Sequence, residues 1–156
     1  MKVERMILIV FLGNYLVNNV VAGLASLVPA NPAATEPMLT AQYFTFAILA
    51  AVAIAIIAWW YFKSAAAGLV PGLIFGVVGF VVTVVTAFIT GVSGVLLQTG
   101  SLGQVAAVLP NFGPYLINKT TLVLFVIWIV PAILVGWFLQ KRTTSSAPMS
   151  SPSSMM

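Results

Sequence analysis

The sequence predicts an all-α membrane protein, a bundle of four transmembrane helices with both termini in the cytoplasm. Two features of composition support this: 62% of the 156 residues are hydrophobic, and only 5% are charged. A soluble domain is typically about a quarter charged, so this chain could not cover a globule in water. The third feature is that four apolar stretches reach the roughly 20 residues needed to cross a bilayer.

The four stretches are separated by short polar or proline-containing segments. They comprise residues 6–28, 42–62, 69–97 and 116–139. We expect residues 1–142 to form one four-helix membrane domain. Residues 143–156 are rich in Ser, Pro and Met, so we expect them to form a disordered cytoplasmic tail.

Two segments leave alternatives open. The first stretch could be a cleaved secretory signal, since Val-Pro-Ala at 28–30 resembles a cleavage site. We favour a retained helix, because Glu4 lies in the charged region and asparagines interrupt the apolar run. Residues 101–109 could form a short helix at the outer interface, ended by Pro110. An ordered loop is the interpretation that we favour there.

The basic residues predict the direction of the spans. Five of the six lie on one side of the predicted bundle: Lys2, Arg5, Lys63, Lys141 and Arg142. Only Lys119 lies on the other side, near the outer end of the fourth stretch. The positive-inside rule therefore places both termini in the cytoplasm.

The third stretch carries a continuous stripe of small residues. Each step along it is three or four residues, so all members share one helix face: Gly68, Gly72, Gly76, Gly79, Thr83, Thr86 and Thr90. In lipid such a face lets another helix backbone approach closely. We expect the glycine half to pack on the alanine face of the second helix, at Ala47, Ala51, Ala55 and Ala58. We favour a central helix of the bundle over a homodimer interface.

Two asparagines lie inside the first stretch. Counting about 1.5 Å per residue places Asn14 and Asn18 roughly 12 and 18 Å deep, near the midplane. Thr83 has a similar depth in the third helix, so we expect Asn18 near Thr83 and Asn14 near Gly79. Polar side chains at this depth either bind helices together or line a path for a solute. We favour the first role, in which the asparagines hold helices together, unless a hydrated cavity reaches both of them.

The chemistry available to the chain is narrow. It has no Cys and no His, and Glu4 and Glu36 are the only acids, both outside the spans. We therefore expect no catalytic site, no metal and no cofactor. The basic residues flank apolar stretches and form no patch for nucleic acid. We expect Lys119 to extend to the headgroups; the alternative is that it attracts an anionic group.

Short motifs give a resemblance. Trp-Tyr-Phe-Lys at 60–63 precedes a short turn and the Gly68/Gly72/Gly76 repeat, and Gly-Trp-Phe-Leu at 136–139 precedes the last basic pair. In this order the chain resembles small four-helix proteins of bacterial inner membranes, for which no activity is established. The resemblance implies an integral protein of the bacterial plasma membrane.

These observations predict a multi-pass, non-enzymatic protein with a structural or accessory role. Its expected partners are the lipid bilayer and other membrane proteins or a second copy of itself. The alternative is a small oligomeric channel or transporter for a small solute, acting through Asn14, Asn18 and the threonines. A membrane enzyme is the interpretation that we favour least, because no nucleophile–base pair is apparent.

Overall fold

The computed structural model describes residues 3–29, 40–116 and 118–145, and it contains helices and loops without a strand in those ranges. Four helical segments are long and apolar enough to cross a membrane: 3–25, 41–62, 69–99 and 119–145. The predicted all-α fold, with four helices long and apolar enough to span a membrane, is confirmed. The first span is continuous but built from three pieces: α1 (Val3–Leu16), the π-helical turn η1 (Val17–Val21) and α2 (Ala22–Ala25).

The other helices are α3 (Ala41–Phe62), α4 (Leu69–Thr99), α5 (Leu102–Leu116) and α6 (Lys119–Ser145). The favoured loop over 101–109 is wrong, because α5 forms there and continues through Pro110. The chain reverses direction between α4 and α5, and Gly100 makes this turn possible. With a φ of 63°, it ends α4 in the left-handed conformation and donates its N–H to Leu96 O at 2.8 Å.

Two boundaries in the C-terminal part differ from the prediction. The fourth span begins at Lys119 and not at 116, because Leu116 is the last residue of α5. α6 also continues to Ser145, three residues beyond the expected end of the membrane domain at 142. The rest of the expected tail, 146–156, lies outside the described residues.

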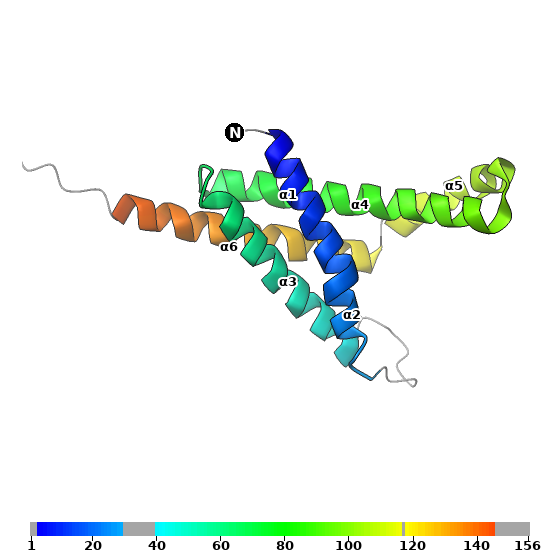
Figure 1. Ribbon diagram of the computed structural model, residues 1–156, viewed down its shortest axis with the longest axis horizontal. Helices are drawn as coiled ribbons and strands as arrows, with labels where there is room; N and C mark the ends of the chain where they lie inside the picture. The colour runs from blue at the N-terminus through cyan, green and yellow to red at the C-terminus, as the bar shows by residue number, and fades with distance from the viewer. Residues whose placement is uncertain (1–2, 30–39, 117, 146–156) are drawn as a thin grey trace, which may run out of the picture.

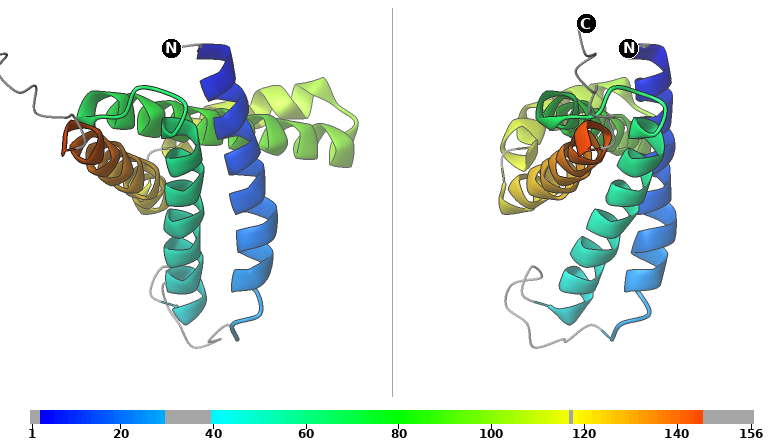
Figure 2. Two further views of the ribbon diagram at one scale, coloured as in Figure 1. Left: turned by 60° about the vertical axis from the view of Figure 1, so that its left-hand side comes forward. Right: turned by 90° about the vertical axis from the view of Figure 1, so that its left-hand side faces the viewer.

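The four spans form two antiparallel pairs. α1 runs beside α3, α4 runs beside α6, and the two pairs cross steeply (Figures 1 and 2). This differs from a regular four-helix bundle, in which all helices run close to one axis. The start of α1, the α3–α4 loop and the end of α6 lie toward the same side of the molecule (Figure 2).

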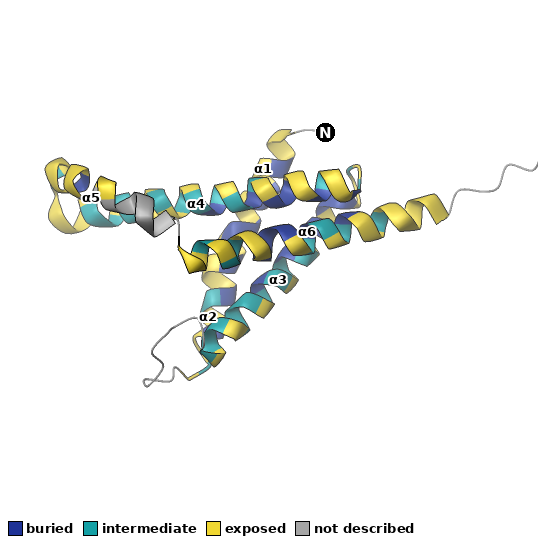
Figure 3. Ribbon diagram, turned by 180° about the vertical axis from the view of Figure 1, so that it is seen from behind, coloured by how far each residue is buried: buried dark blue, intermediate teal, exposed yellow. Residues whose placement is uncertain are grey.

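The buried residues gather where the pairs cross, and the outward faces are exposed (Figure 3). Four large side chains are fully buried there: Val10, Ile54, Phe75 and Trp128. Large apolar side chains such as Phe44, Ile56 and Leu122 are more than half exposed. A surface of this kind needs lipid, because water would leave much apolar area hydrated.

The glycines of α4 pack on the backbone of α6. A methyl group added at Gly72 would meet Ala132 O at 2.7 Å, and one at Gly76 would meet Ile129 Cα at 2.8 Å. At Gly79 it would overlap the indole ring of Trp128. The close approach predicted from the stripe is therefore confirmed, including at Gly68, which faces Gly136 of α6.

The expected partner of this stripe is wrong. The helix that carries the expected alanine face, α3, packs mainly on α6, and of that face only Ala58 is fully buried. The glycines of α4 meet α6 instead. The indole of Trp128 on α6 needs the space that Gly79 leaves empty. α4 and α6 together form the centre of the molecule, and α1 and α3 pack against them.

Candidate functional site

A polar contact joins α1 to α4 where the two helices cross. Asn14 is 2% exposed and Thr83 is 7% exposed, and the Thr83 hydroxyl donates to Asn14 Oδ1 at 3.0 Å. The same hydroxyl also lies 2.9 Å from Gly79 O on its own helix. Because a hydroxyl has one proton, it is shared between these two acceptors. We call the Asn14–Thr83 pair the clasp.

The expected pairing of Asn18 with Thr83 is wrong by one helical turn. Asn14 and not Asn18 bonds Thr83, while Asn18 Nδ2 donates to Asn14 Oδ1 at 2.9 Å. Counting depth assumes that two helices run side by side. Here they cross steeply, so contact is confined to the crossing and the helices diverge beyond it (Figure 1).

The chain after the clasp winds more widely than an α-helix. In η1 the Ala22 N–H reaches Val17 O, five residues back. Asn19 Nδ2 donates to Tyr15 O at 2.8 Å, which fixes the amide against α1. Single π-turns inside helices are frequent at functional sites. Here the turn presents two consecutive asparagines, Asn18 and Asn19, toward one side.

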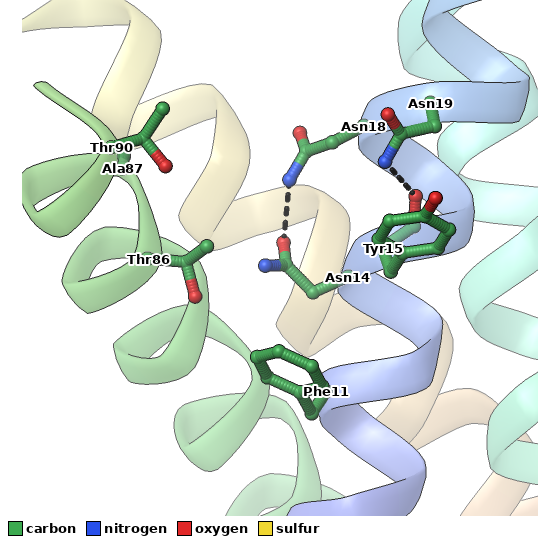
Figure 4. A pocket seen from close by; sticks show the side chains of 8 residues that line it. All are labelled: Phe11, Asn14, Tyr15, Asn18, Asn19, Thr86, Ala87 and Thr90. Atoms are coloured by element: carbon green, nitrogen blue, oxygen red, sulfur yellow. Dashed lines mark hydrogen bonds between the residues drawn. The ribbon is translucent and has the colours of Figure 1, made fainter. Parts of the chain in front are cut away.

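A groove of about 530 Å³ opens between α1 and α4 beyond the clasp. Eight residues line it: Phe11, Asn14, Tyr15, Asn18, Asn19, Thr86, Ala87 and Thr90. Figure 4 shows the asparagine side chains on the wall formed by α1 and η1 and the threonines on the α4 wall, with the Asn14 amide nitrogen pointing into the space between them. Asn18, Asn19 and Thr90 are exposed, so the groove is open at the surface of this chain. We call it the polar groove.

The predicted residues are thus divided among three places. Gly68, Gly72, Gly76 and Gly79 form the α4–α6 interface. Asn14 and Thr83 form the clasp, and Asn18, Thr86 and Thr90 line the polar groove beside it. Lys119 is exposed at the first residue of α6 and does not line the groove.

Sequence reasoning missed part of the site. A regular helix turns Asn19 about 100° away from Asn18, which predicts a different neighbour for it. The wide turn of η1 brings Asn19 into the polar groove as well. The signal in the sequence is the Asn-Asn pair within an apolar run, an expensive placement unless both amides have a use.

The groove offers neutral hydrogen-bonding groups. Amides supply donors and acceptors, hydroxyls supply both, and Phe11 and Tyr15 supply aromatic walls. In the described ranges, no group of three His, Cys, Asp or Glu side chains comes together to hold a metal ion. Comparisons of this chain with protein-family models, curated proteins and solved structures find no match.

Proposed function

We propose that the protein is a non-enzymatic structural or accessory subunit of a membrane complex. In this proposal the polar groove holds a transmembrane helix of another subunit that carries polar side chains at mid-span. The observation that supports it is the position of Asn18, Asn19 and Thr90. They are exposed within two apolar spans, beside a clasp that already joins the helices of this chain.

Polar groups are costly in hydrocarbon unless they are hydrogen-bonded. An amide that faces lipid has no water to bond, and burying it without a partner costs several kcal/mol on cyclohexane-like scales, roughly 4–8. The side chain of Asn18 donates to Asn14 and that of Asn19 donates to Tyr15 O, which leaves the amide oxygens as acceptors. A helix with Ser, Thr, Asn or Gln would bond these oxygens and cover the groove.

A small oligomeric channel or transporter is the second candidate function. The same amides and hydroxyls favour it, because they would suit a hydrated path if several copies turned their grooves toward a common axis. In one copy the polar groove is open at its side, so the groove alone does not enclose such a path. Both proposals therefore require the chain to assemble with other chains. They differ in what fills the polar groove, which is another helix in the first and water in the second.

We further propose that the chain lies in a bacterial plasma membrane with both termini in the cytoplasm. The excess of basic residues at one set of helix ends supports this orientation. Further support comes from the start of α1, the α3–α4 loop and the end of α6, which gather on one side (Figure 2). A fluorescent-protein fusion after residue 156 should fluoresce, and a secreted phosphatase fused there should be inactive.

The accessory role is tested on the protein extracted from its own membranes in mild detergent. We expect a defined complex with a different membrane protein, measured by native mass spectrometry. Asn18→Leu and Thr90→Val should reduce the complex together. Ile89→Ala, which changes an exposed apolar side chain next to the groove, should leave it intact. Recovery of the monomer alone would contradict the proposal, and a complex of identical copies would favour the channel.

A further inference from the structure

A second site lies where the ends of α3 and α6 meet, well away from the polar groove. It combines aromatic and basic side chains from both helices: Trp59, Lys63, Trp137, Phe138, Lys141 and Arg142. Trp59 of α3 and Phe138 of α6 join the two helices, with ring centroids 6.0 Å apart. We call this cluster the basic corner.

Each cation of the basic corner is held against an aromatic ring. Lys63 Nζ lies 6.0 Å from the centroid of Trp59, and Lys141 Nζ lies 5.5 Å from that of Trp137. Arg142 Cζ lies 4.6 Å from the centroid of Phe138. These distances are within the range of cation–π attraction. The rings thus hold three positive charges at the level where the apolar spans end.

Two hollows adjoin at this corner. The first, of about 310 Å³, is almost wholly apolar and lies along the span between Trp59, Leu134, Val135, Trp137 and Phe138. The second, of about 390 Å³, lies near the C-terminal end of α6, lined by Trp137, Phe138, Lys141, Arg142 and Ser145. Trp137 and Phe138 line both, so the two hollows share part of their walls.

Both helices of the basic corner contribute cations and no acid. The sequence contains no Asp or Glu after Glu36, so neither α3 nor α6 carries one. Three cations beside an apolar hollow at the end of a span complement a molecule with an anionic head and a hydrocarbon tail. Basic pockets of transmembrane helices bind the head groups of anionic phospholipids. Here the described residues that line the cationic hollow belong to α6, and the apolar hollow lies between α3 and α6.

We propose that the basic corner is a binding site for an anionic glycerophospholipid. Its phosphate lies between Lys141 and Arg142, near the hydroxyl of Ser145, and an acyl chain follows the hollow along Leu134 and Val135. Lys63, at the end of α3, lies over Trp59, a residue that lines the apolar hollow. The lipid would thereby connect the two helix pairs on the side away from the clasp.

The test is lipid binding to the delipidated full-length protein in detergent, followed by native mass spectrometry. The probes are phosphatidylglycerol and phosphatidylcholine with identical acyl chains. We expect phosphatidylglycerol to be preferred, and the double variant Lys141→Gln/Arg142→Gln to lose that preference by about thirty-fold. Lys119→Gln removes an exposed cation at the opposite end of α6 and should keep it.

Two further arms separate a lipid from a free anion. Filling the apolar hollow with Leu134→Trp should weaken phosphatidylglycerol binding, while Leu122→Trp, at an exposed position elsewhere on α6, should not. Millimolar inorganic phosphate should fail to displace the lipid. Equal binding of the two lipids by the wild type, an unchanged preference in the double variant, or full displacement by phosphate would overturn the proposal.

Discussion

The two interfaces of α4 are built in opposite ways. Toward α6, glycines bring the two helix backbones together over several turns. Toward α1, contact is confined to one crossing and includes the buried bond between Thr83 and Asn14. In hydrocarbon, close packing supplies an extended contact, whereas a polar pair fixes the point at which two helices meet.

The largest expected effect is at the glycine interface. Gly72→Leu would place its side chain against the carbonyl of Ala132, which cannot move without displacing α6. Overpacking of this kind typically costs about 1–3 kcal/mol, and more against a rigid backbone. We expect a loss at the upper end of that range, measured by unfolding in SDS-containing mixed micelles with tryptophan fluorescence.

The matched control is Gly94→Leu on the same helix, because nothing lies within 4 Å of the added Cβ there. It should change the free energy of unfolding far less. If both variants lost the same amount, the close approach of α4 and α6 would not be a source of stability.

A compensating pair makes the same comparison sharper. Gly79→Val should destabilise the protein because its side chain overlaps the indole ring of Trp128. Adding Trp128→Leu removes that overlap, so we expect the double variant to be more stable than the sum of the two single changes predicts. Strict additivity in the same unfolding assay would argue against this contact.

A smaller effect is expected at the clasp. A double-mutant cycle with Asn14→Leu and Thr83→Val measures the coupling of the two side chains directly. Hydrogen bonds between membrane helices average about 0.6 kcal/mol in such cycles, with a maximum near 1.7. We expect a value at the upper half of that range because both residues are buried. The cycle Asn19→Leu with Thr83→Val should give a value near zero, because Asn19 donates to Tyr15 O and does not bond Asn14.

The smallest effect on stability is expected at the rim of the polar groove. Thr90 is exposed and bonds no other helix in the described structure, so Thr90→Val should change the free energy of unfolding by less than about 0.5 kcal/mol. The same variant should weaken assembly, as measured by native mass spectrometry. If Thr90→Val lowered the free energy of unfolding as much as it weakened the complex, Thr90 would have a role in the fold alone.

The sequence predicts elements and faces better than it predicts partners. Four apolar stretches and a glycine stripe follow from length and spacing, and both are present. The partner of Gly79 could not be predicted, because every apolar helix is a candidate neighbour and only the shape of Trp128 selects α6. The pairing of Asn14 with Thr83 depends on a crossing angle, which spacing along one helix does not encode.

The polar groove also depends on how two helices cross, which the sequence does not predict. The sequence locates Asn14, Asn18 and the threonines, but the groove exists because α1 and α4 diverge after their crossing. Asn19 enters it through η1, a local change of winding that propensity does not predict. The composition does predict that these amides need partners, since lipid offers none.

The central claim is that another helix covers the polar groove, and single cysteines test it most directly because the chain has none of its own. Thr90→Cys lies in the groove, and Ile89→Cys lies next to it on an exposed apolar position. Each is labelled in native membranes with a membrane-permeant photo-crosslinker and, separately, with a charged aqueous maleimide. We expect Thr90→Cys to crosslink to one defined membrane protein while resisting the aqueous reagent, and Ile89→Cys to give no protein crosslink. Crosslinking to lipid alone at both positions, or rapid aqueous labelling at Thr90→Cys, would contradict the claim.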